Sequence, residues 1–194
     1  PENAVEEIEF RFFRDSVTRL LSLENGNAQI MGELPPLDAR NIAGGSDVVL
    51  QPTAIGGQPL QFYFNTEQAP TDDIRVRQAL IYGINRTAIV EAVYQGFSPQ
   101  AWGPLSAATV YYNRGVEGVY DYNIEQAEAL LESAGYSDSD SDGILDLDGE
   151  PLEITVLQPP WGLLPQVAQL LRDQWSIIGV DAQIEPVPGY TTLL

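Results

Sequence analysis

The stretch FYFNTEQAPTDDIRVRQALIYGINR, residues 62–86, is the most informative part of this chain. Apolar and polar residues alternate over 60–65, which is the pattern of a half-buried strand. Asp72 or Asp73 can then cap a helix by accepting hydrogen bonds from its first backbone N–H groups, and Asn85 can end that helix and cap the next. The apolar face of the first helix has helical spacing: Val76, Ala79, Leu80 and Ile84.

The composition argues for a globular binding protein rather than an enzyme. The chain has 194 residues and is 44% hydrophobic, which is enough for a well-packed core. It has no cysteine and no histidine, so it lacks thiol chemistry, disulfides and the commonest general base. The paired carboxylates, Asp72 with Asp73 and Glu6 with Glu7, are adjacent rather than facing each other across a cleft. We therefore expect no catalytic residues.

The charge is strongly one-sided, with 28 acidic residues against nine arginines and a net charge of −19. Nucleic acid is excluded as an expected partner, because phosphate recognition needs a basic face. The acidity has two readings, solubility or a high-salt habitat, and the sequence leaves both open. No window of about 20 apolar residues predicts a transmembrane helix. The chain opens at PENAVEEIEF without Met or a basic leader, so we expect a piece of a longer product.

The order of periodic segments predicts an α/β fold. Helices of about ten residues separate the predicted strands, which favours helices packed on a mixed sheet. Residues 97–122 lack a clear period and are predicted to form an ordered loop. The predicted strands are 8–12, 28–31, 48–50, 58–65, 152–156 and 180–186, and the predicted helices are 15–25, 73–96, 123–135 and 165–178.

Four segments in order resemble the family 5 extracellular solute-binding proteins, the receptors of ABC importers for oligopeptides, dipeptides and nickel. The 62–86 stretch is similar to the family's Asn-ended strand and its Asp-x-x-Val-Arg-Gln-Ala-Leu helix. The other three are EIEFRFFRDSVTRLLSLENGNAQI at 7–30, NIEQAEALLESAG at 123–135 and PQVAQLLRDQWSIIGVDAQIE at 165–185. The resemblance covers most of the chain.

This resemblance implies a periplasmic-binding-protein-like (type II) lobe, with residues 1–194 forming one truncated second lobe. It implies an extracytoplasmic receptor, periplasmic or lipid-anchored, that captures a peptide or similar small solute between two lobes. Its partners would be that solute, the membrane permease of the importer, and a missing first lobe of the same protein. No cofactor is required by such a function.

Residues 137–150, SDSDSDGILDLDGE, form the one metal-type motif. Asp138, Asp140 and Asp142 stand at positions 1, 3 and 5 of a calcium loop. Ile144 would offer its carbonyl oxygen, and Asp146 stands at position 9. Position 12 carries Gly149 instead of the bidentate Glu, and a strand rather than a helix is predicted to follow. A structural calcium site and a solvated turn therefore both stay open.

Trp161 and Pro160 are the first predicted ligand contacts, because they follow a strand and precede a helix, where ligands of open α/β sheets collect. A hydrophobic staple at the helix start is the alternative for Trp161. Asn65, Trp102 and Tyr112 are weaker ligand candidates, with a turn and loop packing as their alternatives.

Two other functions remain as alternatives to the receptor. A calcium-binding structural or adhesion module without a transport role would make use of the acidic loop. A glycosidase would need two facing carboxylates about 5 to 10 Å apart.

Overall fold

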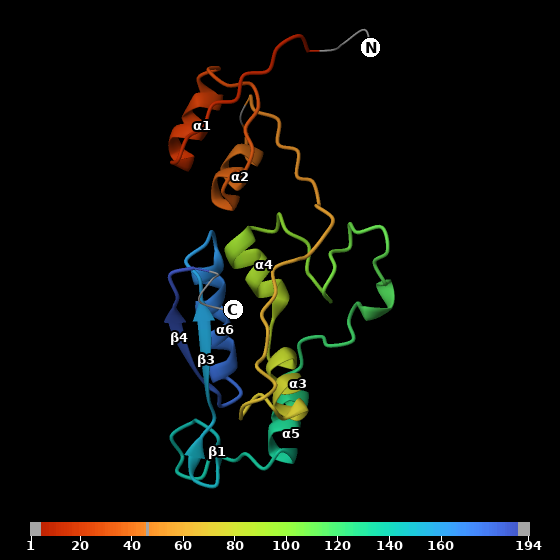
Figure 1. Cartoon of the computed structure of the whole chain (residues 1–194), viewed down its shortest axis with the longest axis vertical. Coiled ribbons are helices and arrows are strands. Elements are labelled where there is room, and N and C mark those ends of the chain that lie inside the picture. The colour runs from red at the N-terminus through yellow and green to blue at the C-terminus, as the bar shows by residue number, and fades with distance from the viewer. Residues whose placement is uncertain (1–4, 46, 190–194) are drawn as a thin grey trace. The chain divides into compact units, whose positions relative to one another are not determined.

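The computed structural model describes residues 5–45 and 47–189 (Figure 1). The chain divides into two compact units, Pro1–Pro52 and Thr53–Leu194. The boundary lies in a stretch without helix or strand. All strands found in the described residues belong to the second unit.

The first unit contains the helices α1 (Ser16–Glu24) and α2 (Pro36–Ala43). As predicted, Asp15 caps α1, because its Oδ1 accepts a hydrogen bond from the Thr18 N–H at 2.8 Å. The strands predicted at 8–12, 28–31 and 48–50 are wrong, since these residues belong to no ladder. A strand needs a neighbouring strand to take up its N–H and C=O groups, and none lies beside them in the described residues.

The strand predicted at 58–65 is also wrong, because these residues belong to no ladder. The segment is held through its aromatic rings instead. Phe62 meets Phe64 edge-on at 5.1 Å and meets the buried Trp175 edge-on at 5.8 Å between ring centroids. Its alternating pattern therefore reflects one-sided packing without strand pairing.

The helix pair that follows is formed as the capping residues predict. Asp73 caps α3 (Ile74–Tyr82) by accepting the Arg75 N–H at 2.7 Å. Asn85 caps α4 (Arg86–Tyr94) by accepting the Ala88 N–H at 2.9 Å. Both helices begin directly after a side chain that satisfies an orphan backbone N–H group.

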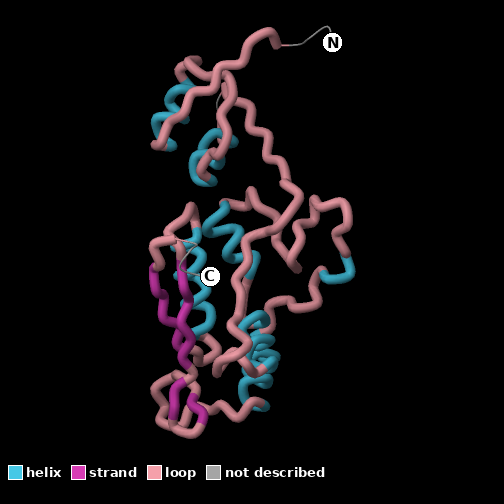
Figure 2. Tube along the Cα trace, in the orientation of Figure 1, coloured by secondary structure: helices cyan, strands magenta, loops and turns pink. Residues whose placement is uncertain are grey.

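The remainder of the second unit alternates helix and strand (Figure 2). A loop with one 3-10 turn, η1 (Arg114–Val116), leads to α5 (Ile124–Ser133) and an antiparallel pair, β1 (Asp146–Leu147) with β2 (Glu150–Pro151). The strands β3 (Glu153–Gln158) and β4 (Asp181–Pro186) run parallel. The helix α6 (Leu164–Ser176) connects them, as parallel pairing requires a crossover.

The core of the second unit is built around Trp175 of α6, which is 2% exposed. Its indole Nε1–H donates to the Leu80 carbonyl oxygen of α3 at 2.8 Å. Among the described residues, no helix has the length and apolar character that crossing a bilayer requires. The buried members of this core come from α3 to α6, β3, β4 and their connections: Val76, Ala79, Leu80, Ile84, Ile89, Ala127, Leu131, Leu152, Ile154, Val167, Leu171, Trp175, Ile178, Val180 and Ala182.

Gly179 lets the turn between α6 and β4 approach the chain before β1. It has φ +74°, and a Cβ there would lie 2.6 Å from Leu145 Cγ. Its carbonyl oxygen accepts the Leu145 N–H at 2.8 Å. Glycine is required at this position, because a side chain would be strained at this positive φ angle and would collide with Leu145.

Replacing Trp175 with Phe should lower the free energy of unfolding by about 2 to 4 kcal/mol. The change opens a cavity in the core and leaves the buried Leu80 carbonyl oxygen without this donor. Urea unfolding measures it. Trp161→Phe is the matched control, because Trp161 is half exposed and should change stability by less than about 0.5 kcal/mol. Equal losses in the two variants would contradict the central role of Trp175.

The Asp73 cap predicts an acid-dependent contribution to stability. Hydrogen bonds from the Arg75 side chain and backbone N–H lower the pKa of Asp73. A lowered folded-state pKa stabilises the fold fully above the ordinary carboxyl pKa of about 4 and loses that effect as the pH falls through the folded value. Asp73→Asn should therefore be less stable at pH 7 by at most about 1 kcal/mol, and the difference should shrink below about pH 3. Unfolding curves across pH measure this, with Asp72→Asn as a control that leaves the cap intact.

Candidate functional site

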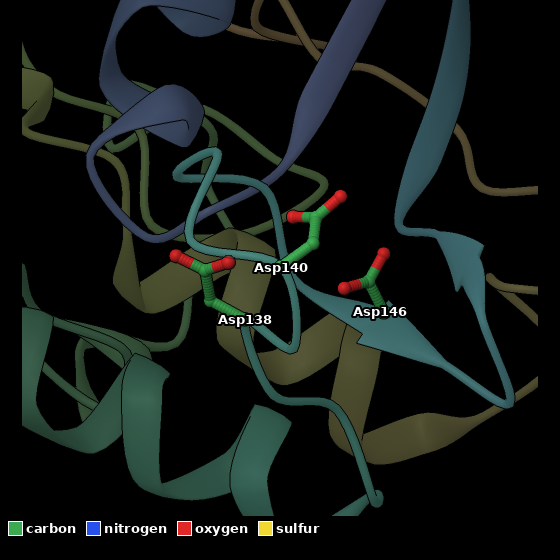
Figure 3. Close-up of side chains that lie close together, drawn as sticks. All are labelled: Asp138, Asp140 and Asp146. Atoms are coloured by element: carbon green, nitrogen blue, oxygen red, sulfur yellow. The ribbon is translucent and has the colours of Figure 1, made fainter.

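The acidic loop 137–150 lies between α5 and β3 and brings three carboxylates together. Asp138, Asp140 and Asp146 each offer one oxygen, and these oxygens lie within 4.8 Å of one another (Figure 3). Asp142, which the sequence predicts as a fourth carboxylate ligand, is not part of this group. Ile144, whose carbonyl oxygen is a predicted calcium ligand, is partly buried.

Asp138, Asp140, Asp142 and Asp146 also accept hydrogen bonds from the loop itself. Asp138 accepts the N–H groups of Ser141 at 2.7 Å and Gly143 at 3.2 Å. Asp146 accepts the N–H and the hydroxyl of Ser139 at 3.1 and 2.7 Å. The remaining two follow the same pattern, with Asp140 accepting from Asp142 N–H and Asp142 from Ile144 N–H. These hydrogen bonds are typical of a turn in which carboxylates accept the backbone N–H groups of the same turn. Such a self-capped turn is the alternative to a metal-binding loop.

A shallow hollow of about 410 Å³ opens beside the acidic loop. Tyr136 borders it, and burial raises the pKa of Tyr136, with a smaller contribution from Asp72 and Asp73. No basic residue of the described chain lines the hollow. Its lining combines carboxylates with apolar side chains, among them Glu128, Glu132, Asp138, Leu145, Ile177 and Ile178.

Trp161 and Pro160 lie in the turn between β3 and α6, at the carboxyl end of the parallel pair. The Trp161 N–H donates to the Pro159 carbonyl oxygen at 2.8 Å, and half of the Trp161 surface is exposed. A hydrophobic staple needs an apolar side chain directly before the N-cap residue. The N-cap is Leu163 and the residue before it is Gly162, so Trp161 does not occupy the staple position.

Asn65 starts a turn, as the simpler interpretation of the sequence predicts. Its Oδ1 accepts the Glu67 N–H at 3.0 Å, and its carbonyl oxygen accepts the Thr71 hydroxyl at 2.6 Å. The Arg77 guanidinium fastens the same turn by donating to the carbonyl oxygens of Thr71 and Asp72, both at 2.8 Å. Asn65 therefore has a structural role whether or not it also contacts a ligand.

Trp102 packs under Arg86, a residue that the sequence does not single out. The guanidinium carbon of Arg86 lies 5.0 Å from the centre of the Trp102 ring, and Nη1 donates to the Tyr120 carbonyl oxygen at 2.7 Å. Arg86 thus touches both ends of the loop that carries Tyr112. This contact favours loop packing for Trp102. Asn65, Trp102 and Trp161 lie on three different connecting segments of the second unit, before α3, after α4 and between β3 and α6.

Comparison with known proteins identifies the family to which this chain is similar. The model of the family described as "Bacterial extracellular solute-binding proteins, family 5 Middle" matches residues 1–193. The dipeptide-binding protein of Escherichia coli is 29% identical over 180 residues, covering 93% of this chain and 32% of that protein. The nickel-binding periplasmic protein of Escherichia coli is 27% identical over 188 residues, covering 93% and 35%. The chain thus spans about a third of the length of these curated relatives.

Solved structures agree on the fold. NikA from Brucella suis in complex with Fe(III)-EDTA superposes with a TM-score of 0.76 at 20% identity, covering 93% of this chain and 37% of that one. An ABC transporter substrate-binding protein from Sinorhizobium meliloti superposes with a TM-score of 0.71 at 27% identity, covering 90% and 37%. The mixed α/β arrangement is therefore that of type II periplasmic binding proteins.

Proposed function

The chain belongs to the bacterial extracellular solute-binding proteins of family 5, and from this membership we propose that it is part of the substrate-binding component of an ABC importer. Members of this family bind solutes and are not enzymes. The match of the family model along residues 1–193 is the observation that carries the proposal. The relatives are named for different solutes, among them dipeptides, nickel, heme and glutathione.

The proposed receptor captures a peptide or similar small solute between two lobes that close over it. Contacts made by both lobes favour the closed state, so a membrane permease can distinguish loaded from empty receptor by a population shift. This chain would supply part of the second lobe, and the first lobe would come from the same polypeptide. The full-length receptor would act outside the cytoplasm, in the periplasm or anchored by lipid at the cell surface.

Trp161 and Pro160 are the proposed ligand contacts. The support is their position at the carboxyl end of the parallel pair β3 and β4, together with the exposed indole of Trp161. Asn65, Trp102 and Tyr112 stay further predicted contacts, although the hydrogen bonds of Asn65 and the Arg86 stacking of Trp102 are explained by local structure.

We expect the full-length receptor to retain a small solute through purification, which native mass spectrometry would identify. Trp161→Ala should weaken the affinity for that solute about fivefold or more, because a stacked aromatic side chain contributes more than about 1 kcal/mol. Tyr63→Ala is the matched control, since Tyr63 is 76% exposed and is not a predicted contact. Purification without any bound small molecule, and no binding from a peptide library, would contradict the receptor function.

We also propose a second candidate, a structural calcium ion held by Asp138, Asp140 and Asp146 with Asp142 and Ile144 nearby. The support is the convergence of three carboxylate oxygens within 4.8 Å, since calcium takes oxygen ligands at this density. Under this candidate the chain would be a calcium-binding structural or adhesion module, or a receptor that carries such a module.

If calcium occupies the loop, its addition should release heat in calorimetry and raise the melting temperature. Asp140→Asn should abolish both effects, because Asp140 belongs to the carboxylate group. Asp148→Asn should leave them intact, since Asp148 lies in the same loop outside that group. Calcium addition without heat and without a change in melting temperature would remove the second candidate and leave the self-capped turn.

A further inference from the structure

The carboxylates of this chain outnumber its basic groups far beyond what ion pairing can balance. Even if each of the nine arginines neutralised one acidic residue, a net charge of −19 would remain. The salt bridges in the described part of the chain are also local, because each joins residues at most three positions apart. They pair Glu9 with Arg11, Asp73 with Arg75, Glu117 with Arg114, and Asp173 with Arg172.

Several arginines hold the backbone, and a hydrogen bond to a carbonyl oxygen neutralises no carboxylate. A guanidinium offers about five N–H donors in a planar fork, whereas a lysine ammonium is a compact, strongly hydrated charge. The chain has arginine at all nine basic positions and no lysine. Basic residues are thus present where a guanidinium can build structure. The arginines that donate to backbone carbonyl oxygens are Arg11, Arg19, Arg75, Arg77 and Arg86.

One long stretch of the second unit has carboxylates and no basic residue at all. It runs from Arg114 to Arg172 and contains α5, the acidic loop, β1, β2, β3 and most of α6. Its acidic residues are exposed except Asp146, which is partly buried. They are Glu117, Asp121, Glu125, Glu128, Glu132, Asp138, Asp140, Asp142, Asp146, Asp148, Glu150 and Glu153.

Carboxylates of α5 and of the acidic loop meet around one hollow. Glu125, Glu128 and Glu132 follow one another on α5 at spacings of three and four residues, where like charges repel each other. Glu128 and Glu132 line the same hollow as Asp138 of the loop. The acidic face of the helix therefore continues into the loop, so folding gathers charges that repel each other.

We propose that this acidic surface makes the fold depend on salt, so that the second unit reaches full stability only when dissolved cations screen its carboxylates. Self-repulsion at high net charge disfavours the compact state. Salt shortens the reach of each charge from about 10 Å at 0.1 M to about 3 Å at 1 M. The cations form a diffuse layer around the surface, which needs no defined binding site. The acidity of the sequence is then an adaptation to a saline medium rather than to solubility alone.

Thermal unfolding of the 194-residue chain at increasing NaCl concentration tests the proposal. Tryptophan fluorescence follows the second unit, because Trp102, Trp161 and Trp175 all belong to it. The melting temperature should rise by about 8 °C or more between about 0.05 M and about 2 M NaCl, with EDTA present to exclude calcium. A rise of less than about 2 °C would overturn the proposal, as would the absence of a folding transition at every salt concentration.

Charge variants separate screening from the general strengthening of apolar burial by salt. Replacing Glu128, Glu132, Glu150 and Glu153 together with Gln keeps their size and removes four negative charges. This variant should melt about 4 °C or more above the parent in about 0.05 M NaCl, and within about 2 °C of it in about 2 M NaCl.

Arg114→Gln is the control of opposite sign, because it removes a positive charge from an exposed side chain. It should lower the melting temperature by about 2 °C in dilute salt and leave it unchanged in concentrated salt. Parallel salt curves for the parent and both variants would overturn the proposal, because salt would then act through the core. The measurements involve no solute, so their failure would leave the proposed receptor function unaffected.

Discussion

The hydrogen bond from the Trp175 indole to the Leu80 carbonyl oxygen is the contact on which the second unit depends. Trp175 lies on α6 and Leu80 on α3, so one buried side chain fixes the helix that crosses between β3 and β4 against the helix pair that precedes the long loop. Phe62 adds an edge-on ring contact to the same indole. Gln174, the neighbour of Trp175, also accepts the Asn85 N–H at 2.9 Å, which attaches the start of α4 to the same turn of α6.

The helices could be predicted from the sequence because their determinants are local. Asp15, Asp73, Asn85 and Asn123 each cap the helix that follows them, and each is recognisable within a few residues of the apolar face that it precedes. The strands depend on partners far away in the chain. Residues 8–12 and 58–65 have the right alternation, yet a ladder forms only where a neighbouring strand is present, and the pattern of one segment contains no information about that neighbour.

The candidate site shows the same division between local and distant determinants. The acidic loop could be recognised from its spacing, and three of its four predicted carboxylate ligands do meet. The geometry that separates Asp142 from them comes from turns within the loop, which the spacing does not encode. The contact of Arg86 with Trp102 joins the first residue of α4 to the irregular loop that follows this helix, so no periodic signal could reveal it. The staple at Trp161 fails for a reason visible only in the structure, since α6 begins one residue too late for it.

The anchoring of the acidic loop has a consequence for how this part of the chain can vary. Its base is tied at two points, by the Ser137 and Asp146 backbone bridge and by the bond from Leu145 to Gly179. The tip, residues 138–143, is exposed. Surface loops with fixed ends tolerate insertions at little cost. Sequences of other lengths, such as a spectroscopic tag or a different ion-binding peptide, can therefore be inserted at the tip. The hydrogen bond between Leu145 and Gly179 would still hold the base of the loop against the core.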